Sequence, residues 1–206
     1  MKTEVETSCD AFHRGAFHLI QPKTGAHRAG IDAMLLAASV KDDTAFKLAD
    51  FGAGVGAVGL AVASRCQKAE ITLIERDPAM AHLAVQTLKR PENAHLADRV
   101  SVQEADVAQL PNTQADANSF DWVVMNPPFN DPKDRATPHA GRSDAHVMPA
   151  DLFNVWLRKA STILHAKGRM ALIARPFSLH EILIAAERRF GAIRIVPVLP
   201  RADEAA

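Results

Sequence analysis

Short apolar segments rich in β-forming residues alternate with longer amphipathic segments along most of this chain. The β-type segments are residues 47–51, 70–75, 99–104, 120–125, 168–175 and 192–198. Helical spacing of apolar residues marks 77–90, 150–164 and 178–190, and Ser178 with Glu181 predicts a capping box in the last of these. The order strand, helix, strand predicts an α/β fold with a doubly wound, mostly parallel, Rossmann-like sheet. Such a sheet binds ligands beyond the carboxyl ends of its strands.

Length and composition predict a single domain. The chain has 206 residues, 48% of them hydrophobic, enough for one core. We expect residues 47–200 to form that core and residues 1–46 to lie on the substrate and cofactor side, with a helix from Ile31 onward. Two cysteines without a disulfide framework favour the cytoplasm. No apolar run reaches the roughly 18 residues of a membrane span, and no cluster of potential ligands predicts a metal site.

The first expected strand runs into a glycine-rich stretch, ADFGAGVGAVGLAVA. Glycines between a strand and a helix are typical of a nucleotide-cofactor site, because the backbone approaches a ligand closely only where no Cβ intervenes. Gly54, Gly56 and Gly59 spell GxGxxG, the pattern of dinucleotide-binding proteins. Asp50, Gly52, Gly54 and Gly56 equally spell DxGxGxG, the pattern of methyltransferases that use S-adenosylmethionine (SAM).

Acidic residues favour SAM over a dinucleotide. Asp50 would repel a pyrophosphate but suits a ligand with an ammonium and a sulfonium group. Glu75, followed by Arg76 at the end of the second strand, predicts contacts with ribose hydroxyls, which both cofactors require. Asp106 after the third strand predicts an acceptor for the adenine amino group. Asp32 either complements the positive end of the helix that begins near it or contacts the ligand, and the sequence leaves both open.

The fourth strand ends in VVMNPPFND, residues 123–131. The lone pair of a planar amine is delocalised, so its nitrogen attacks a methyl group only if acceptors hold its two N–H groups. Asn126, beside the cofactor, supplies an amide oxygen for this, and Pro127 supplies a carbonyl without a competing N–H. Phe129 offers a ring on which a planar substrate can stack. The structural alternative is a turn that merely ends the strand.

These motifs resemble those of the class I SAM-dependent amino-methyltransferases. The stretch QPKTGAHRAGIDAMLLAA, with Gly30, Ile31 and Asp32, more narrowly resembles the tRNA1(Val) adenine-N6-methyltransferase group. The resemblance implies methyl transfer from SAM to the exocyclic amine of an adenine beside a tRNA anticodon. By motif position it implies that SAM is held by Gly52, Gly54, Glu75 and Asp106, and the base by Asn126, Pro127 and Phe129. Members usually have seven strands, and we expect the last, antiparallel one to be missing here.

Other functions fit parts of the pattern. A protein glutamine carries the same kind of amide nitrogen, and small-molecule methylation, including O-methylation, is a further alternative. A nicotinamide-dependent oxidoreductase would use the GxGxxG glycines, but the chain has no tyrosine for a Tyr-Lys pair. Residues 131–201 carry twelve Lys or Arg against six Asp or Glu, a balance of +6 that suits either RNA or an ordinary surface. We expect a loop at residues 130–148, where Lys133, Arg135 and Arg142 are candidates for phosphate contacts.

Overall fold

A parallel β-sheet forms the centre of the molecule. The computed structural model describes residues 6–24, 28–41, 44–110, 119–127 and 151–199. In these parts, five strands lie in the order β5-β4-β3-β6-β7, and every neighbouring pair is parallel. The strands are β3 (Phe46–Phe51), β4 (Ala69–Glu75), β5 (Val100–Glu104), β6 (Phe120–Met125) and β7 (Leu164–Leu172). The predicted doubly wound parallel sheet is confirmed.

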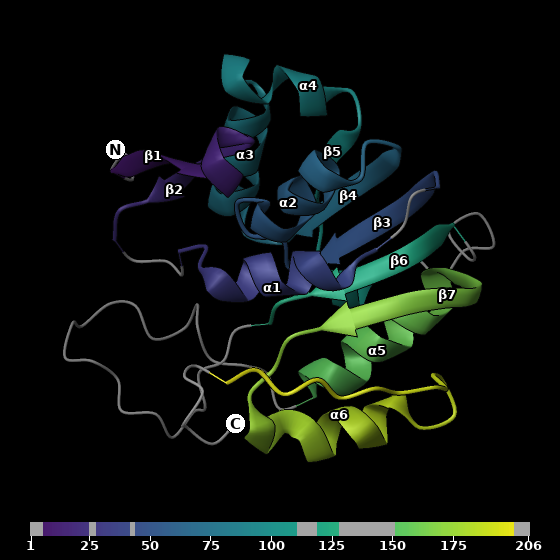
Figure 1. Cartoon of the computed structure of the whole chain (residues 1–206). Coiled ribbons are helices and arrows are strands. Elements are labelled where there is room, and N and C mark those ends of the chain that lie inside the picture. Colours follow the sequence, from purple (N-terminus) through teal and green to yellow (C-terminus); the bar gives the residue numbers. More distant parts are fainter. Residues whose placement is uncertain (1–5, 25–27, 42–43, 111–118, 128–150, 200–206) are drawn as a thin grey trace.

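Helices cover both faces of this sheet (Figure 1). The first face carries α1 (Ile31–Ser39), α2 (Ala57–Arg65), α3 (Pro78–Leu88) and the short α4 (Ala94–Ala97), and the second carries α5 (Leu152–Ile163) and α6 (Leu179–Ala186). Side chains of β3 alternate between the two hydrophobic cores, since Leu48 packs in the first whereas Ala49 and Phe51 pack in the second. This alternation explains why the strands read as continuous apolar runs.

A side-chain cap begins α3 as local chemistry favours, but the capping box predicted for the last helix does not form. Asp77 caps α3 by accepting from the amide of Ala79 at 2.8 Å, and Pro78 occupies the first helical position. The capping box predicted at Ser178 is wrong, because the Ser178 side chain makes no capping hydrogen bond. Ser178 has helical backbone angles and ends the 3-10 turn η4 (Pro176–Ser178), whereas a capping side chain needs an extended residue.

An N-terminal hairpin was not predicted. Strand β1 (Thr7–Phe12) pairs antiparallel with β2 (Phe17–Pro22) across the turn η1 (His13–Gly15). Phe17 and Leu19 bury their side chains in the first core, and the amide of Ile20 donates to the hydroxyl of Thr87 on α3 at 2.9 Å. The sequence of β2 is a short mixture of apolar and polar residues, which is too weak a pattern to separate it from a loop, although four of its six positions are buried.

The strand predicted at residues 192–198 does not form. Residues 191–199 carry no strand in the structure, and Ile193, Ile195 and Val196 expose half or more of their side chains. A strand requires a neighbour for its backbone N–H and C=O groups, and among the described residues no strand pairs with β7 on the side away from β6. The β-type composition of this segment therefore has no sheet edge to join in the part of the chain that the structure describes.

Candidate cofactor and acceptor site

Three strand ends bring the main predicted residues together. Phe51 of β3 is in register with Ile74 of β4 on one side and with Met125 of β6 on the other. The residues that follow these positions are Gly52, Glu75 and Asn126. Because neighbouring strands lie about 4.8 Å apart, the three residues are adjacent along the carboxyl edge of the sheet. The cofactor side and the acceptor side predicted from the sequence therefore meet at one edge.

Hydrogen bonds fix the glycine turn after β3. The amides of Gly52 and Ala53 both donate to the carbonyl of Ile74, at 2.9 and 3.1 Å. The amide of Gly54 donates to Glu75 Oε2 at 2.8 Å, and the amide of Asp77 donates to Glu75 Oε1 at 2.8 Å. The Glu75 carboxylate is thus held in place by two backbone donors. A carboxylate has about four acceptor positions, so it retains capacity for two ribose hydroxyls.

Asp50 lies beneath this turn as a buried carboxylate. Its side chain is 1% exposed, and its Oδ2 accepts from the amide of Gly59 at 2.9 Å. Helix α2 has Gly56 at its N-cap and no capping side chain of its own, so Asp50 supplies the missing acceptor from the preceding strand. Burial raises the pKa of Asp50 to about 7, the Gly59 hydrogen bond lowers it, and the nearby Glu75 charge raises it further.

The burial and charge of Asp50 favour SAM over a dinucleotide. A carboxylate deprived of water is stabilised by a positive group nearby and destabilised by an anion. SAM carries a sulfonium and an ammonium, whereas a dinucleotide would bring a pyrophosphate. Asp50, beneath the glycine turn, therefore fits SAM and opposes a pyrophosphate, whereas Glu75 suits the ribose of either cofactor.

Gly59 is a packing residue. A Cβ at Gly59 would lie 2.3 Å from Cδ2 of Leu73 and 3.0 Å from Cγ2 of Ile71, so only glycine allows α2 to lie this close to β4. The last glycine of the GxGxxG pattern thus reflects the close packing of α2 on β4. That requirement is common to both cofactor classes, and Gly59 does not discriminate between them.

Three cofactor-side candidates remain, namely Asp106, Arg76 and Asp32. Asp106 follows β5 and caps the 3-10 turn η3 (Val107–Gln109) by accepting from the amide of Ala108 at 2.8 Å. Arg76 is exposed directly after Glu75, and no hydrogen bond or ion pair within the described ranges involves it. Asp32 is half-buried in the first turn of α1, after the N-cap Gly30. The structure does not bring Asp32 or Arg76 into hydrogen bonds with the glycine turn.

The acceptor side contains a buried oxygen without a donor. Asn126 directly follows β6, and no donor within the described residues reaches its buried Oδ1. Pro127 is buried beside it. Buried side-chain oxygens are normally hydrogen-bonded, so an unpaired one at a strand end marks a place where a ligand donor fits. Phe129 and the loop expected at residues 130–148 lie outside the described residues.

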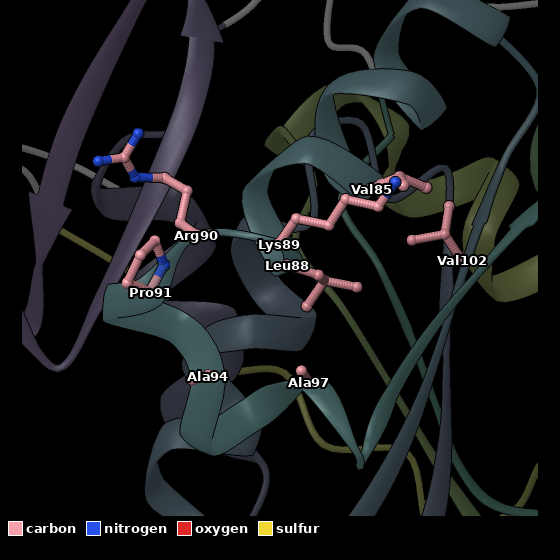
Figure 2. A pocket seen from close by; sticks show the side chains of 8 residues that line it. All are labelled: Val85, Leu88, Lys89, Arg90, Pro91, Ala94, Ala97 and Val102. Atoms are coloured by element: carbon pink, nitrogen blue, oxygen red, sulfur yellow. The ribbon is translucent and has the colours of Figure 1, made fainter.

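A separate open pocket lies away from this edge. Its volume is about 430 Å³, and it lies between the end of α3, the turn η2 (Pro91–Asn93), α4 and β5 (Figure 2). Leu88 and Val102 contribute to its lining, whereas the Arg90 side chain points away and pairs with Glu92 at 2.8 Å. None of the predicted site residues lines it. The pocket is therefore not the site that the sequence predicts.

No group of three or more His, Cys, Asp or Glu side chains in the described ranges is arranged to hold a metal ion. None of the helices there is both long and apolar enough to cross a membrane. One residue beside the glycine turn was missed by sequence reasoning: Trp156 lies in segment 150–164, where helical spacing predicts a helix, but nothing in its spacing indicates that it reaches Gly52.

The fold and the site together define a class I methyltransferase. More particularly, the chain belongs to the family described as the methyltransferase small domain, whose model matches residues 27–197. SAM is the cofactor of this class, in agreement with the prediction from Asp50 and the glycines.

Individual relatives give finer similarities. The chain is 33% identical over 164 residues to a tRNA1(Val) (adenine(37)-N6)-methyltransferase from Pasteurella multocida, covering 77% of this chain and 65% of that protein. It is 30% identical to the protein of the same name from Porphyromonas gingivalis, covering 84% of this chain and 69% of that one. A crystal structure from Agrobacterium tumefaciens, described as a predicted O-methyltransferase, is 40% identical with a TM-score of 0.62, covering 76% of this chain and 67% of that one. The chain thus spans about two thirds of the length of these relatives.

Proposed function

We propose that this protein methylates an exocyclic amino nitrogen with SAM as the methyl donor, and that its substrate is the N6 amine of an adenine in tRNA. The observation that carries the proposal is the buried Oδ1 of Asn126 at the end of β6, which has no hydrogen-bond partner among the described residues. Asn126 directly follows β6 and lies beside Gly52, because β6 pairs with β3, the strand that the glycine turn follows. An oxygen in this position lacks only a donor, and an amino group provides one.

The chemistry assigns distinct tasks to the two sides of the edge. SAM supplies a methyl group on a positively charged sulfur. Asn126 Oδ1 and the carbonyl of Pro127 each accept one N–H of the amine, which orients the nitrogen and directs its lone pair out of the plane of the base. The excess N–H proton of the methylated product passes to water. Alignment and polarisation of this kind need no general base of unusual pKa.

The number of donors favours an amine over a hydroxyl. Two acceptors, an amide oxygen and a prolyl carbonyl, match the two N–H groups of a primary amine, whereas a hydroxyl has one hydrogen and needs a base to remove it. Neither acceptor is basic enough for that task. O-methylation, which the description of the Agrobacterium structure suggests, is therefore the second candidate.

Adenine in tRNA is favoured over a protein glutamine by two observations. The names of the curated relatives concern a tRNA adenine. The balance of +6 over residues 131–201 suits a polyanion rather than a neutral peptide. Asn126 itself does not separate the two substrates, since a carboxamide carries the same two N–H groups. A tRNA substrate would place the reaction in the cytoplasm.

Label transfer tests the substrate. Methyl-tritiated SAM would be incubated with the protein and with either tRNA transcribed without modifications or bulk protein, and the tRNA would be digested to nucleosides. We expect label in N6-methyladenosine. Label in protein glutamine, or in a ribose or other hydroxyl, would contradict the proposed substrate and identify a different one.

Binding measurements test the two remaining parts of the proposal. Calorimetry should show binding of S-adenosylhomocysteine (SAH) and no binding of NAD; tight NAD binding alone would contradict the cofactor assignment. Affinity for tRNA should fall steeply as salt increases, because phosphate contacts release counterions. A flat salt dependence would contradict a nucleic-acid substrate.

A further inference from the structure

Trp156 of α5 reaches the cofactor turn from the second face of the sheet. Its side chain is half-buried and packs against the core that contains Phe51. A Cβ built on Gly52 would lie 2.6 Å from Cη2 of Trp156, closer than real side chains approach one another. Gly52 and the indole are thus fitted to each other, and the glycine is required here for space as well as for its φ of +66°.

The ring meets Gly52 with its edge. The same built Cβ lies 3.4 Å from Cζ3 and 3.5 Å from Cζ2, the two atoms that flank Cη2. Nearly equal flanking distances place Gly52 beyond the tip of the six-membered ring rather than over its face. Phe51 holds the ring from the side, with centroids 6.2 Å apart and planes at 84°. The Cη2 tip of the indole therefore points at Gly52, the first residue of the turn.

The turn is constrained from both sides. On the sheet side, the carbonyl of Ile74 accepts from the amides of Gly52 and Ala53. On the α5 side, the tip of Trp156 closes the space next to Gly52. A leucine at position 156 would fill part of the apolar core but would end short of the glycine. The length and rigidity of the indole are therefore what allow it to reach the turn.

We propose that Trp156 is a positioning residue of the SAM site, acting through Gly52 to set the turn that presents its backbone to the cofactor. The inference concerns the cofactor of the class and does not depend on which amine is methylated. Its failure would therefore leave the proposed substrate untouched.

A double-mutant cycle of Gly52→Ala and Trp156→Leu tests this role. The readout is calorimetric affinity for SAH, measured well below the unfolding temperature of each variant. We expect Trp156→Leu to weaken SAH binding by about tenfold, and Gly52→Ala by more because the new methyl group meets the ring. The double variant should bind SAH no more weakly than Gly52→Ala, because removal of the ring relieves the clash. Wild-type affinity in Trp156→Leu, or fully additive losses, would overturn the proposal.

A matched variant separates positioning from packing. Phe153 lies on the same helix, is 3% exposed and packs in the same core, so Phe153→Leu loosens α5 without removing the indole. We expect it to lower the melting temperature while keeping SAH affinity. An equal loss of SAH affinity in Phe153→Leu would show that Trp156 matters only for general packing.

Fluorescence gives a readout that applies even if Trp156→Leu fails to fold. The chain has two tryptophans, Trp122 and Trp156. In a Trp122→Phe background, Trp156 is the only one, and its emission should change when SAH binds because the ring contacts the turn. An unchanged spectrum at saturating SAH would contradict the proposed coupling between the indole and the cofactor site.

Discussion

The two sides of the carboxyl edge differ in how their polar groups are satisfied. Around β3 and β4, the carboxylates of Asp50 and Glu75 already accept from three backbone amides. At the end of β6, Asn126 Oδ1 is buried with no donor among the described residues. The cofactor side is thus built by the chain's own hydrogen bonds, whereas on the acceptor side no donor among the described residues satisfies Asn126 Oδ1, and our proposal assigns that place to the substrate amine. From this difference we expect cofactor binding and substrate alignment to be separable by mutation.

Asn126→Ala should have the largest effect on turnover. Removing the amide oxygen leaves the substrate amine with one acceptor fewer, so kcat should fall by roughly a hundredfold to a thousandfold, as when one polarising hydrogen bond is removed from an active site. The glycine turn and Glu75 do not depend on this side chain, so SAH affinity should stay within about twofold. Single-turnover methylation and SAH calorimetry measure the two quantities.

Asn126→Asp is the matched control for that change. It keeps an oxygen of the same size but adds a negative charge beside Gly52 and removes the amide donor. Retained SAH affinity with low kcat in both variants would support the separation of the two sides. If Asn126→Ala abolished SAH binding, Asn126 would be a structural residue of the cofactor side and the contrast would fail.

Glu75→Ala should affect binding more than catalysis. It removes the acceptor for the amides of Gly54 and Asp77 as well as the expected ribose contacts. Loss of charge-assisted hydrogen bonds of this kind corresponds to about a hundredfold weaker SAH binding. At saturating SAM, kcat should remain near that of the wild type, because Asn126 is intact. Glu75→Gln, which keeps an oxygen acceptor, should lose less SAH affinity than Glu75→Ala. Equal losses of affinity in the two variants would assign the effect to charge alone.

Asp50→Asn should change how SAM binding and stability depend on pH. Burial raises the pKa of Asp50 from 3.8 to about 7, so the folded chain holds this proton more tightly than the unfolded chain. The free energy of unfolding should therefore decrease as pH rises from about 4 to about 7 and then level off. A pKa difference of this size corresponds to roughly 4 kcal/mol at most. Asn keeps an oxygen for the Gly59 amide, so the variant should be more stable than the wild type at pH 8.

SAM binding should show the opposite trend to stability. The positive groups of SAM lower the pKa of Asp50, so binding releases a proton and SAM affinity should rise by about tenfold at most between pH 6 and pH 8. Asp50→Asn should bind SAM more weakly at pH 8 and lose this pH dependence. Calorimetry in buffers of different ionisation enthalpy measures the released proton. An unchanged pH dependence in the variant would show that Asp50 does not respond to the cofactor.

The cofactor side was more predictable than the rest because its determinants are local. Asp50, the glycines and Glu75 lie at strand ends, and a parallel sheet brings strand ends together whatever the details of packing. The Trp156 contact depends on how α5 rotates against Phe51, which periodicity does not specify. The strand at 192–198 was predicted from composition, but a strand forms only where a neighbouring edge accepts it. The hairpin of β1 and β2 was missed because its burial rests on contacts with distant α3.

Arg76→Ala should have the smallest effect on the cofactor side. The sequence placed Arg76 among the cofactor residues because it follows Glu75, but its side chain is exposed and is not held by a hydrogen bond or ion pair in the described part of the chain. Exposed charges contribute little in water, so SAH affinity should change by no more than about threefold. The SAH affinity of Arg76→Ala is compared with that of Asp106→Ala, which removes a cap of η3 at the expected adenine position. A loss of more than tenfold in Arg76→Ala would show that the side chain closes on the cofactor, and that the cofactor side is not complete before binding.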